Sequence, residues 1–184
     1  GSLALYTFMN GRAEKKELKP GKGSLVSYNE MIVDQYCVDE KGRPWFSLRG
    51  YMLAMLDKNI LQIQYDKYAH LGKESFGVLY DKYRKKILTA ILSQPYPCQF
   101  DDTTFHMLPV KNKVQVTGIT RIIHQCSNGI ILFSTENGNI FSIDKDNYCR
   151  EQLSGKGNST FVSWFLNDPS GDVWIGYNGI SLKR

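Results

Sequence analysis

The side chains best suited to acid–base or metal chemistry in this sequence are its three histidines, and their placement argues against a catalytic centre. His70, His106 and His124 stand far apart, and no HxxH, HExxH or GxSxG sequence occurs. Those motifs bring metal ligands, or a nucleophile and its base, within reach of one another. The acidic residues fall mostly in turn-like segments, where turn capping explains them. We therefore predict no catalytic residue, no metal site and no cofactor for this chain.

The four cysteines give no sign of redox or metal chemistry either. Cys37, Cys98, Cys126 and Cys149 are never closer than 23 residues in sequence, so no CxxC pair is available for zinc or redox chemistry. This spacing does not resemble a disulfide framework. We expect small buried side chains that pack as hydrophobic groups.

One set of residues could bind a sugar. It combines tyrosine rings with planar amide or guanidinium groups at four places, namely Arg49 with Tyr51, Tyr96, Asn137, and Tyr177 with Asn178. A tyrosine ring can stack on the apolar face of a pyranose while amide and guanidinium groups pair with its hydroxyls. These residues predict an oligosaccharide ligand. The alternative is that the Asn-Gly pairs only form hairpin turns and the tyrosines only pack at the rim.

A second set is made of lysines that follow a glycine. They are Lys22, Lys73 and Lys156, in the sequences Gly21-Lys22, Gly72-Lys73 and Gly155-Lys156. None belongs to a phosphate-binding loop, which requires GxxxxGK[ST] between a strand and a helix. Three lysines at corresponding places would ring one face with positive charge and favour an anionic ligand. The alternative is that each lysine is simply solvated.

An internal repeat positions these candidates. Residues 38–47 and 167–176 both read as Asp, two residues, Gly, two residues, Trp, ending at Trp45 and Trp174. A third copy at 126–135 has Leu132 in the Trp position, and a weaker copy at 80–89 has Lys85 in place of the turn glycine. The turn positions 42, 85, 129 and 171 are spaced by 43, 44 and 42 residues. A period of this length indicates a repeat architecture.

Each repeat unit has room for four short strands, named a to d in chain order. A second landmark, an apolar residue that ends a strand before a polar turn, falls at Phe8, Leu56, Phe100 and Ile143. In the third unit the alternation and the turn residues predict strands over 119–125, 130–135, 139–143 and 148–153. Asp or Asn begins the first turn, Gly supplies a positive φ, and the large residue that follows is buried between sheets. We expect Trp45 and Trp174 to be such core residues.

Residues 74–93 leave an alternative open. Phe76, Leu79, Tyr80, Tyr83, Ile87, Leu88 and Ile91 would also line one face of a helix. The turn position and the strand-ending apolar residue of the repeat both keep their spacing through this stretch, which favours strands.

Four-stranded units of this length are typical of an all-β fold, the β-propeller, in which each unit is one blade around a central channel. We predict a segment of about four four-stranded antiparallel blades, part of a larger propeller. The units are a half blade at 3–18, blades at 27–65, 75–108 and 119–153, and a half blade at 161–184. In such a blade the b–c turns and d–a connections emerge on one face, which would carry both candidate sets.

The repeats resemble the two-component regulator propeller. Residues 168–179 carry the likeness most fully, followed by residues 39–47 and 127–138. The resemblance implies the extracytoplasmic sensor region of a hybrid histidine kinase, best known from gut Bacteroidetes that regulate polysaccharide breakdown. It implies a non-catalytic sensor segment in the periplasm, belonging to a membrane-anchored parent. A protein-interaction propeller and a propeller enzyme such as a lyase are the alternatives.

Composition argues against two kinds of partner, nucleic acid and the membrane. The net charge of +5 is spread along the chain, which does not favour nucleic acid. Apolar runs such as residues 129–133 are far shorter than the roughly 20 residues that cross a bilayer, so we expect no membrane contact by this segment. The opening Gly1-Ser2 suggests a cloning remnant on an excised segment, with targeting information removed.

The half blades leave two forms possible. Either the segment closes as four blades, with residues 3–18 beside the strand near Trp174, or it is an open arc. An open arc would expose sheet edges and apolar end faces, and we expect it to self-associate through them.

Overall fold

The fold is all-β in every part that can be described. The computed structural model describes residues 4–9, 12–17, 19–20, 32–49, 53–58, 60–64, 75–92, 94–101, 104–112, 114–155, 161–178 and 182–183. All regular elements in these ranges are strands. Within the same ranges no helix is long and apolar enough to cross a membrane.

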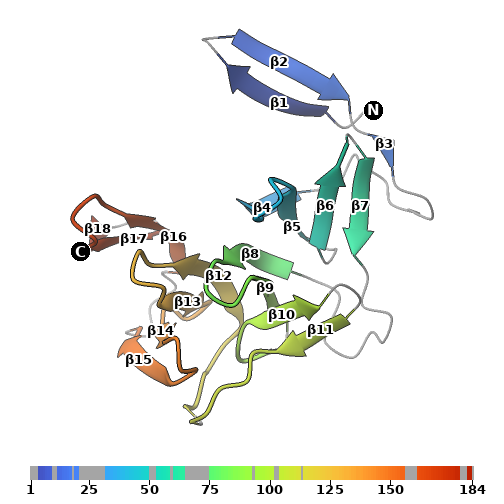
Figure 1. The fold of residues 1–184 in the computed structure, drawn as a ribbon. Coiled ribbons are helices and arrows are strands. Elements are labelled where there is room, and N and C mark those ends of the chain that lie inside the picture. The colour runs from blue at the N-terminus through green and yellow to red at the C-terminus, as the bar shows by residue number, and fades with distance from the viewer. Residues whose placement is uncertain are drawn as a thin grey trace.

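The strands form four successive sheets and one separate hairpin (Figure 1). The hairpin is β1 (Ala4–Met9) with β2 (Arg12–Glu17). Sheet I contains β4 (Ile32–Val38), β5 (Pro44–Arg49), β6 (Leu53–Asp57) and β7 (Ile60–Gln64), with β3 (Lys19–Pro20) parallel to β7. Sheet II contains β8 (Ser75–Asp81), β9 (Lys86–Ile91), β10 (Cys98–Asp101) and β11 (Thr104–Met107). Sheet III contains β12 (Thr120–Gln125), β13 (Ile131–Thr135), β14 (Ile140–Ile143) and β15 (Cys149–Leu153), and sheet IV contains β16 (Val162–Asn167), β17 (Val173–Tyr177) and β18 (Leu182–Lys183).

The helix considered for residues 74–93 does not form. β8 and β9 pair antiparallel there, with Leu79 opposite Leu88. The turn between them forms because Lys85 adopts a φ of +53°, the left-handed conformation that glycine adopts at the corresponding turn positions of the other sheets. Gly42, Gly129 and Gly171 have φ values of +73°, +87° and +93°. The repeat landmark therefore corresponds to one backbone conformation in all four sheets.

The residue three places after this turn position faces the following sheet in the first three sheets. Trp45 packs with Phe100 of sheet II, with ring centroids 5.6 Å apart. Leu88 belongs to the cluster shared with Ile123 and Phe133 of sheet III. Leu132 packs against the cluster of Val162 and Phe165 of sheet IV. Alternation along a strand then fixes which side chains form each interface between sheets.

Trp174 departs from the expectation of a core residue. Trp45 is only 4% exposed, whereas Trp174 is half-buried. Its neighbours Val173 and Ile175 face sheet III, so Trp174 lies on the opposite face of sheet IV. Within the described residues no further sheet covers that face. The same motif is therefore buried at one place and partly exposed at the other.

The turn aspartate and the tryptophan of the motif are joined by a hydrogen bond. The indole Nε1 of Trp45 donates to Oδ2 of Asp39 at 3.0 Å, and that of Trp174 donates to Oδ2 of Asp168 at 3.0 Å. The other carboxylate oxygen, Oδ1, accepts backbone N–H groups across each turn. The third unit has Cys126 in the Asp position and Leu132 in the Trp position, so it lacks both partners.

These contacts predict a loss of stability in acid. Burial alone would raise the pKa of Asp39, but hydrogen bonds from the Trp45 indole and from Arg43 lower it. Hydrogen bonds from the Ser170 hydroxyl and then the Trp174 indole lower the pKa of Asp168 to about 2. A folded-state pKa below the unfolded value of about 3.9 contributes stability that is complete above about pH 4 and is lost as pH falls towards about 2.

We expect Asp168→Asn to lose less stability than the wild type between pH 4 and pH 2, because it removes one of these titrations. Urea unfolding at pH 7, 4 and 2.5 measures the difference. Equal losses for the two proteins would contradict the role assigned to Asp168.

The first strands of the four sheets lie innermost. β4 contacts β8, β8 contacts β12, and β12 contacts β16. Figure 1 shows the β1–β2 hairpin beyond sheet I, at the other end of the molecule from β16–β18. Among the described strands, β1 pairs with β2, whereas β18 pairs with β17. The pairing of residues 3–18 with the strand near Trp174 is therefore absent among the described strands, and the four described sheets form an open arc.

Candidate ligand site at the a–b turn face

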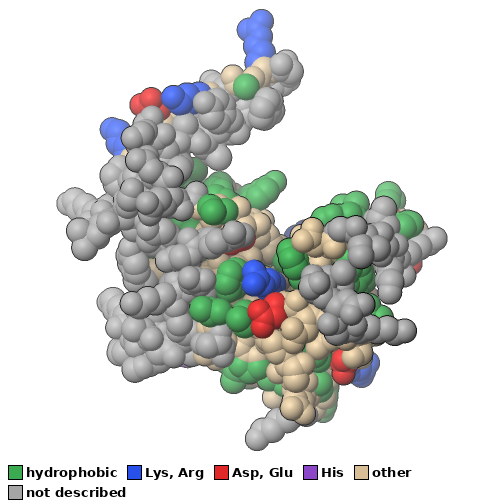
Figure 2. All heavy atoms as spheres, turned by 180° about the vertical axis from the view of Figure 1, so that it is seen from behind, with side chains coloured by type: hydrophobic (Ala, Val, Ile, Leu, Met, Phe, Trp, Pro, Cys, Tyr) green, Lys and Arg blue, Asp and Glu red, His purple; other side chains and the backbone are tan. Residues whose placement is uncertain are grey.

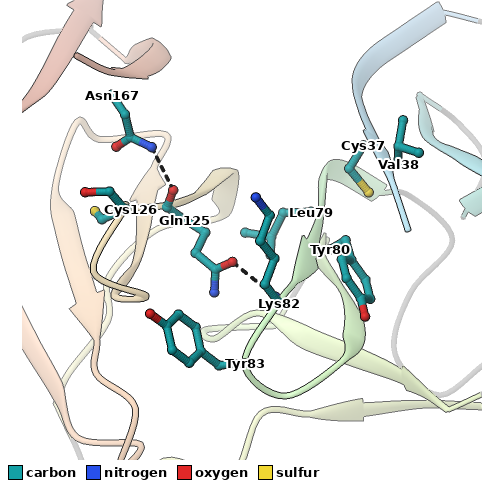
Figure 3. A pocket seen from close by; sticks show the side chains of 10 residues that line it. Cys37, Val38, Leu79, Tyr80, Lys82, Tyr83, Gln125, Cys126 and Asn167 are labelled. Carbon is teal, nitrogen blue, oxygen red and sulfur yellow. Dashed lines mark hydrogen bonds between the residues drawn. The ribbon is translucent and has the colours of Figure 1, made fainter. Parts of the chain in front are cut away.

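A cavity of about 580 Å³ opens where the inner strands end at their a–b turns. Its lining comes from all four sheets and consists of Cys37, Val38, Leu79, Tyr80, Lys82, Tyr83, Gln125, Cys126, Ser127 and Asn167 (Figure 3). Figure 2 shows the molecule hollowed between the lobe that carries β16–β18 and the remaining sheets. The cavity lies at the ends of the four inner strands, β4, β8, β12 and β16.

Two amide side chains in the cavity are held by the inner strands. Gln125 Nε2 donates to Asp81 Oδ1 at 2.7 Å, and Gln125 Oε1 accepts from the backbone N–H of Lys82 at 3.2 Å. Asn167 Nδ2 donates to the backbone carbonyl of Gln125 at 3.0 Å. These bonds connect β8, β12 and β16 in sequence. The amides are therefore fixed in position before any ligand arrives.

The lining also includes the ring of Tyr83 and the side chain of Lys82. Tyr83 is half exposed, and its ring lies against Gly129, where a Cβ atom would collide with it. The Nζ atom of Lys145 lies 4.2 Å from the centroid of the Tyr83 ring. Figure 3 shows Lys82 extending into the middle of the space, beside Gln125. A stacking ring, two amides and a lysine can together bind a polyhydroxylated ligand, including one that carries an anionic group.

A second hollow of about 260 Å³ lies farther along the inner strands β4, β12 and β16. Its lining includes Gln35, which donates from Nε2 to the backbone carbonyl of Ile123 at 2.8 Å, and His124. The His124 ring stacks on Phe165 with centroids 5.7 Å apart. Burial lowers the pKa of His124, so the ring is neutral at pH 7. His106 is exposed on β11, which belongs to sheet II, and it does not line this hollow. Its Nε2 atom lies 2.6 Å from the Thr104 hydroxyl. His70 falls outside the described residues.

The sugar-binding residues expected on the opposite, b–c face are only partly described. Asn137 and Asn178 are exposed in b–c turns, and the backbone N–H of Asn178 donates to the Phe161 carbonyl at 2.9 Å. Arg49 ends β5, but its side chain lies outside the description. Tyr51, Lys22, Lys73 and Lys156 lie outside the described residues altogether.

The two described tyrosines of that set are used for internal packing. The Tyr96 hydroxyl donates to the Val114 carbonyl at 2.6 Å, and the ring meets Phe133 edge-on at 6.3 Å. Tyr177 packs against the cluster of Ile140, Val162 and Phe165. Burial raises the pKa of both hydroxyls. These contacts favour the packing alternative for Tyr96 and Tyr177 over a stacking role.

Sequence reasoning missed the cavity residues Lys82, Tyr83, Gln125 and Asn167. Two signals pointed to them. The a–b turn of sheet II carries an aromatic residue, Tyr83, whereas the a–b turns of the other three sheets carry none. Gln125 and Asn167 are amides that form the last residues of the inner strands β12 and β16. Neither signal identifies a cavity without the arc that brings four strand ends together.

The cysteines behave as expected of small packed side chains. Cys98 and Cys149 are fully buried, and burial raises the pKa of the Cys149 thiol to about 11. Burial, together with the negative charge of Asp39, raises the pKa of Cys37 to about 12. A thiol with such a pKa is protonated at pH 7 and is a poor nucleophile. Cys37 and Cys126 therefore contribute only weakly polar surface to the cavity.

Comparison with known proteins identifies the fold. No protein-family description matches the sequence, and no curated protein does. The structure superposes on the extracellular domain of a protein described as hybrid two component system BT4673 from B. thetaiotaomicron, with a TM-score of 0.65 and 12% identity, over 91% of this chain and 26% of that one. The chain is a β-propeller segment.

Other propellers match at a similar level. The extracellular domain of BT3049 from B. thetaiotaomicron matches with a TM-score of 0.56 and 16% identity, over 78% of this chain and 18% of that one. Virginiamycin B lyase from Staphylococcus aureus matches with a TM-score of 0.64 and 13% identity, over 89% of this chain and 53% of that one. The chain thus spans about a quarter of the first sensor domain and about half of the lyase. Propellers of both kinds share this fold, so the fold alone does not distinguish a sensor from an enzyme.

Proposed function

We propose that this chain is a non-catalytic recognition segment of an extracytoplasmic two-component sensor and that it binds an oligosaccharide in the cavity at the a–b turn face. The observation that carries the proposal is the lining of that cavity, where the Tyr83 ring, Lys82 and the fixed amides Gln125 and Asn167 meet at the ends of four inner strands. The likeness to the extracellular domains of two hybrid two-component systems supports a sensor located in the periplasm.

A rigid arc is suited to reporting ligand binding through its ends. The amides are fixed to the backbones of adjacent sheets, so a ligand that contacts both must fit the spacing between the sheets. Binding then favours one relative placement of sheets II, III and IV. In a sensor, such a preference can be passed on as a rigid-body change at an interface.

The test of the proposal is calorimetry with a panel of neutral and acidic oligosaccharides. We expect Tyr83→Ala to weaken binding about tenfold, because a lost aromatic stack is worth about 1 to 1.5 kcal/mol. Tyr148→Ala is the matched control, since Tyr148 is also half exposed and has the Lys111 Nζ atom 5.2 Å from its ring centroid, but it does not line the cavity. Lys82→Gln should weaken binding of acidic glycans only, and added salt should weaken it as well.

Three results would overturn this proposal. No binding across the panel would remove the glycan assignment. Equal affinities for the Tyr83 and Tyr148 variants would remove the cavity as the site. Affinity that falls only in an Asn137→Ala, Asn178→Ala double variant would move the site to the b–c face.

Enzymatic activity is the second candidate, favoured by the overlap with virginiamycin B lyase and by the placement of His124 beside an inner hollow. For that lyase, a variant lacking one histidine is described as catalytically inactive. Mass spectrometry of virginiamycin B after incubation with this protein separates the candidates. Conversion that His124→Ala abolishes would support the enzyme and contradict the non-catalytic proposal.

A further inference from the structure

The inner hollow of about 260 Å³ and the a–b turn cavity of about 580 Å³ are lined by consecutive parts of the same inner strands. On β4 the inner hollow is lined by residues 34–36 and the cavity by residues 37–38. On β12 and β16 the lining of the inner hollow ends at His124 and Phe165, and the cavity follows. The two linings are offset by roughly three residues along each strand, which corresponds to about 10 Å. The two hollows therefore lie end to end.

The size of the inner hollow suits one part of a ligand. Sites that enclose a whole drug-sized ligand measure roughly 300 to 1,000 Å³. The a–b turn cavity falls within this range, whereas the inner hollow is smaller. A molecule that enters the inner hollow therefore has room there for a single ring, and the rest of a longer molecule would occupy the neighbouring cavity.

Two accessible aromatic rings line the inner hollow, Tyr36 of β4 and Trp164 of β16. Tyr36 is 68% exposed and Trp164 is 42% exposed. The Trp164 ring lies against Gly176, its partner in register on β17, where a Cβ atom would collide with the ring. The backbone of β17 thus positions this ring in advance, so little binding free energy is lost in ordering it. Such rings can stack on the apolar face of a sugar.

The polar part of this lining favours an uncharged sugar unit. The His124 ring is neutral, since burial lowers its pKa and the neighbouring Asn167 amide opposes this only in part. Its buried Nε2 atom has no hydrogen-bond partner of ordinary geometry within the described part of the chain. A ligand hydroxyl can donate or accept, so it can pair with this nitrogen once the ring turns toward the hollow. Asp34 is the charged residue of the lining, and its carboxylate disfavours an acidic sugar beside it.

We infer that the inner hollow is a second subsite for the ligand of the a–b turn cavity and takes an uncharged sugar unit at the end of that ligand. This inference rests on the proposed function, because it assigns the rest of the ligand to the cavity beside Tyr83. The ligand class is then an oligosaccharide of more than one unit that lies along the inner strands. Its inner end is neutral, and any acidic group lies near Lys82. A single sugar ring fills only one of the two hollows, so affinity should rise with chain length.

Calorimetry with chain-length series of cello-, xylo-, manno- and galacturono-oligosaccharides tests this inference. We expect Trp164→Ala to weaken binding of the longer chains about tenfold and to leave the shortest binding chain unchanged, because that chain occupies only the a–b turn cavity. His124→Phe keeps a ring against Phe165 but lacks the ring nitrogens, so it should weaken binding of longer neutral chains about fivefold. Asp34→Asn should strengthen binding of the longer galacturono-oligosaccharides. Leu166→Ala is the matched control, because Leu166 is 57% exposed on the same strand and lines neither hollow.

The possible results separate this inference from the proposed function. Binding that Tyr83→Ala weakens but that does not strengthen with chain length would overturn the second subsite alone. So would a Trp164→Ala effect no larger than that of Leu166→Ala, or one of equal size for the shortest and longest chains. No binding in any series would overturn the proposed function and this inference with it. Circular dichroism checks that each variant is folded, and Trp164→Phe, which keeps a smaller ring, should lose less affinity than Trp164→Ala.

Discussion

Trp45→Ala is expected to destabilise the protein by about 3 to 5 kcal/mol, the range for truncating a large buried aromatic. Trp45 is 4% exposed and shares its cluster with Phe100, Met55 and Val78, so its removal leaves a cavity between sheets I and II. It also removes the indole partner of Asp39, whose carboxylate is buried. Urea unfolding monitored by circular dichroism gives the free energy of unfolding for this variant.

Trp174→Ala is the matched control, because it breaks the same Asp–Trp hydrogen bond on a half-buried face. We expect it to cost about 1 to 2 kcal/mol, since a net hydrogen bond is worth about 1 kcal/mol and less packing is lost. The difference between the two variants measures burial between sheets apart from the turn motif. Equal losses, or a loss below about 1 kcal/mol for Trp45→Ala, would contradict the core assignment.

The strands and turns could be predicted because each repeat encodes them locally. Strands expected over 119–125, 130–135, 139–143 and 148–153 correspond to β12, β13, β14 and β15 within one residue at each end. Lys85 occupies the glycine position with a positive φ, which shows that register along the repeat outweighs residue preference there. Such features depend on neighbours in sequence, which a single chain displays.

The Asp–Trp hydrogen bond and the exposure of Trp174 needed the structure. The repeat shows that Asp39 and Trp45 recur together, but not that the carboxylate accepts the indole N–H six residues later. Burial of the tryptophan depends on whether another sheet covers it, and the motif is the same in both cases. The sequence therefore identifies residues that face a neighbouring sheet in the repeat, but it does not show how deeply each of them is buried.

The candidate site could be predicted least. Tyr96 and Tyr177 have the residue type for sugar stacking, but packing against Phe133 and Val162 uses their rings internally. Gln125, Lys82 and Asn167 come together only because the arc places the ends of β8, β12 and β16 side by side. Convergence of this kind depends on the curvature between sheets, and no local pattern in the sequence records it.

Arg84→Met is expected to cost about 3 kcal/mol, because it leaves the fully buried Asp81 carboxylate without its cationic partner. Arg84 Nη1 lies 2.6 Å from Asp81 Oδ2, and Asp81 is completely inaccessible to solvent. Arg84 also donates to the Asp144 carbonyl at 2.8 Å and to Asn147 Oδ1 at 2.6 Å, so it joins the turns of sheets II and III. Asp81 in turn accepts the Gln125 amide that lines the cavity. The variant should therefore weaken ligand binding in the cavity as well as the fold.

Lys86→Met is the control for this prediction, since Lys86 pairs with Asp101 at 2.9 Å in the same sheet with both partners exposed. An exposed pair contributes about 0 to 1 kcal/mol, because solvent screens it. Urea unfolding at pH 7 should show the large loss for Arg84→Met alone, and Arg84→Lys should restore part of it by returning a charge without the planar fork. Losses of similar size for Arg84→Met and Lys86→Met would show that burial does not strengthen the Asp81 pair. The apolar cluster of Leu88, Ile123 and Phe133 would then contribute more than the Asp81–Arg84 pair to the alignment of sheets II and III at the cavity.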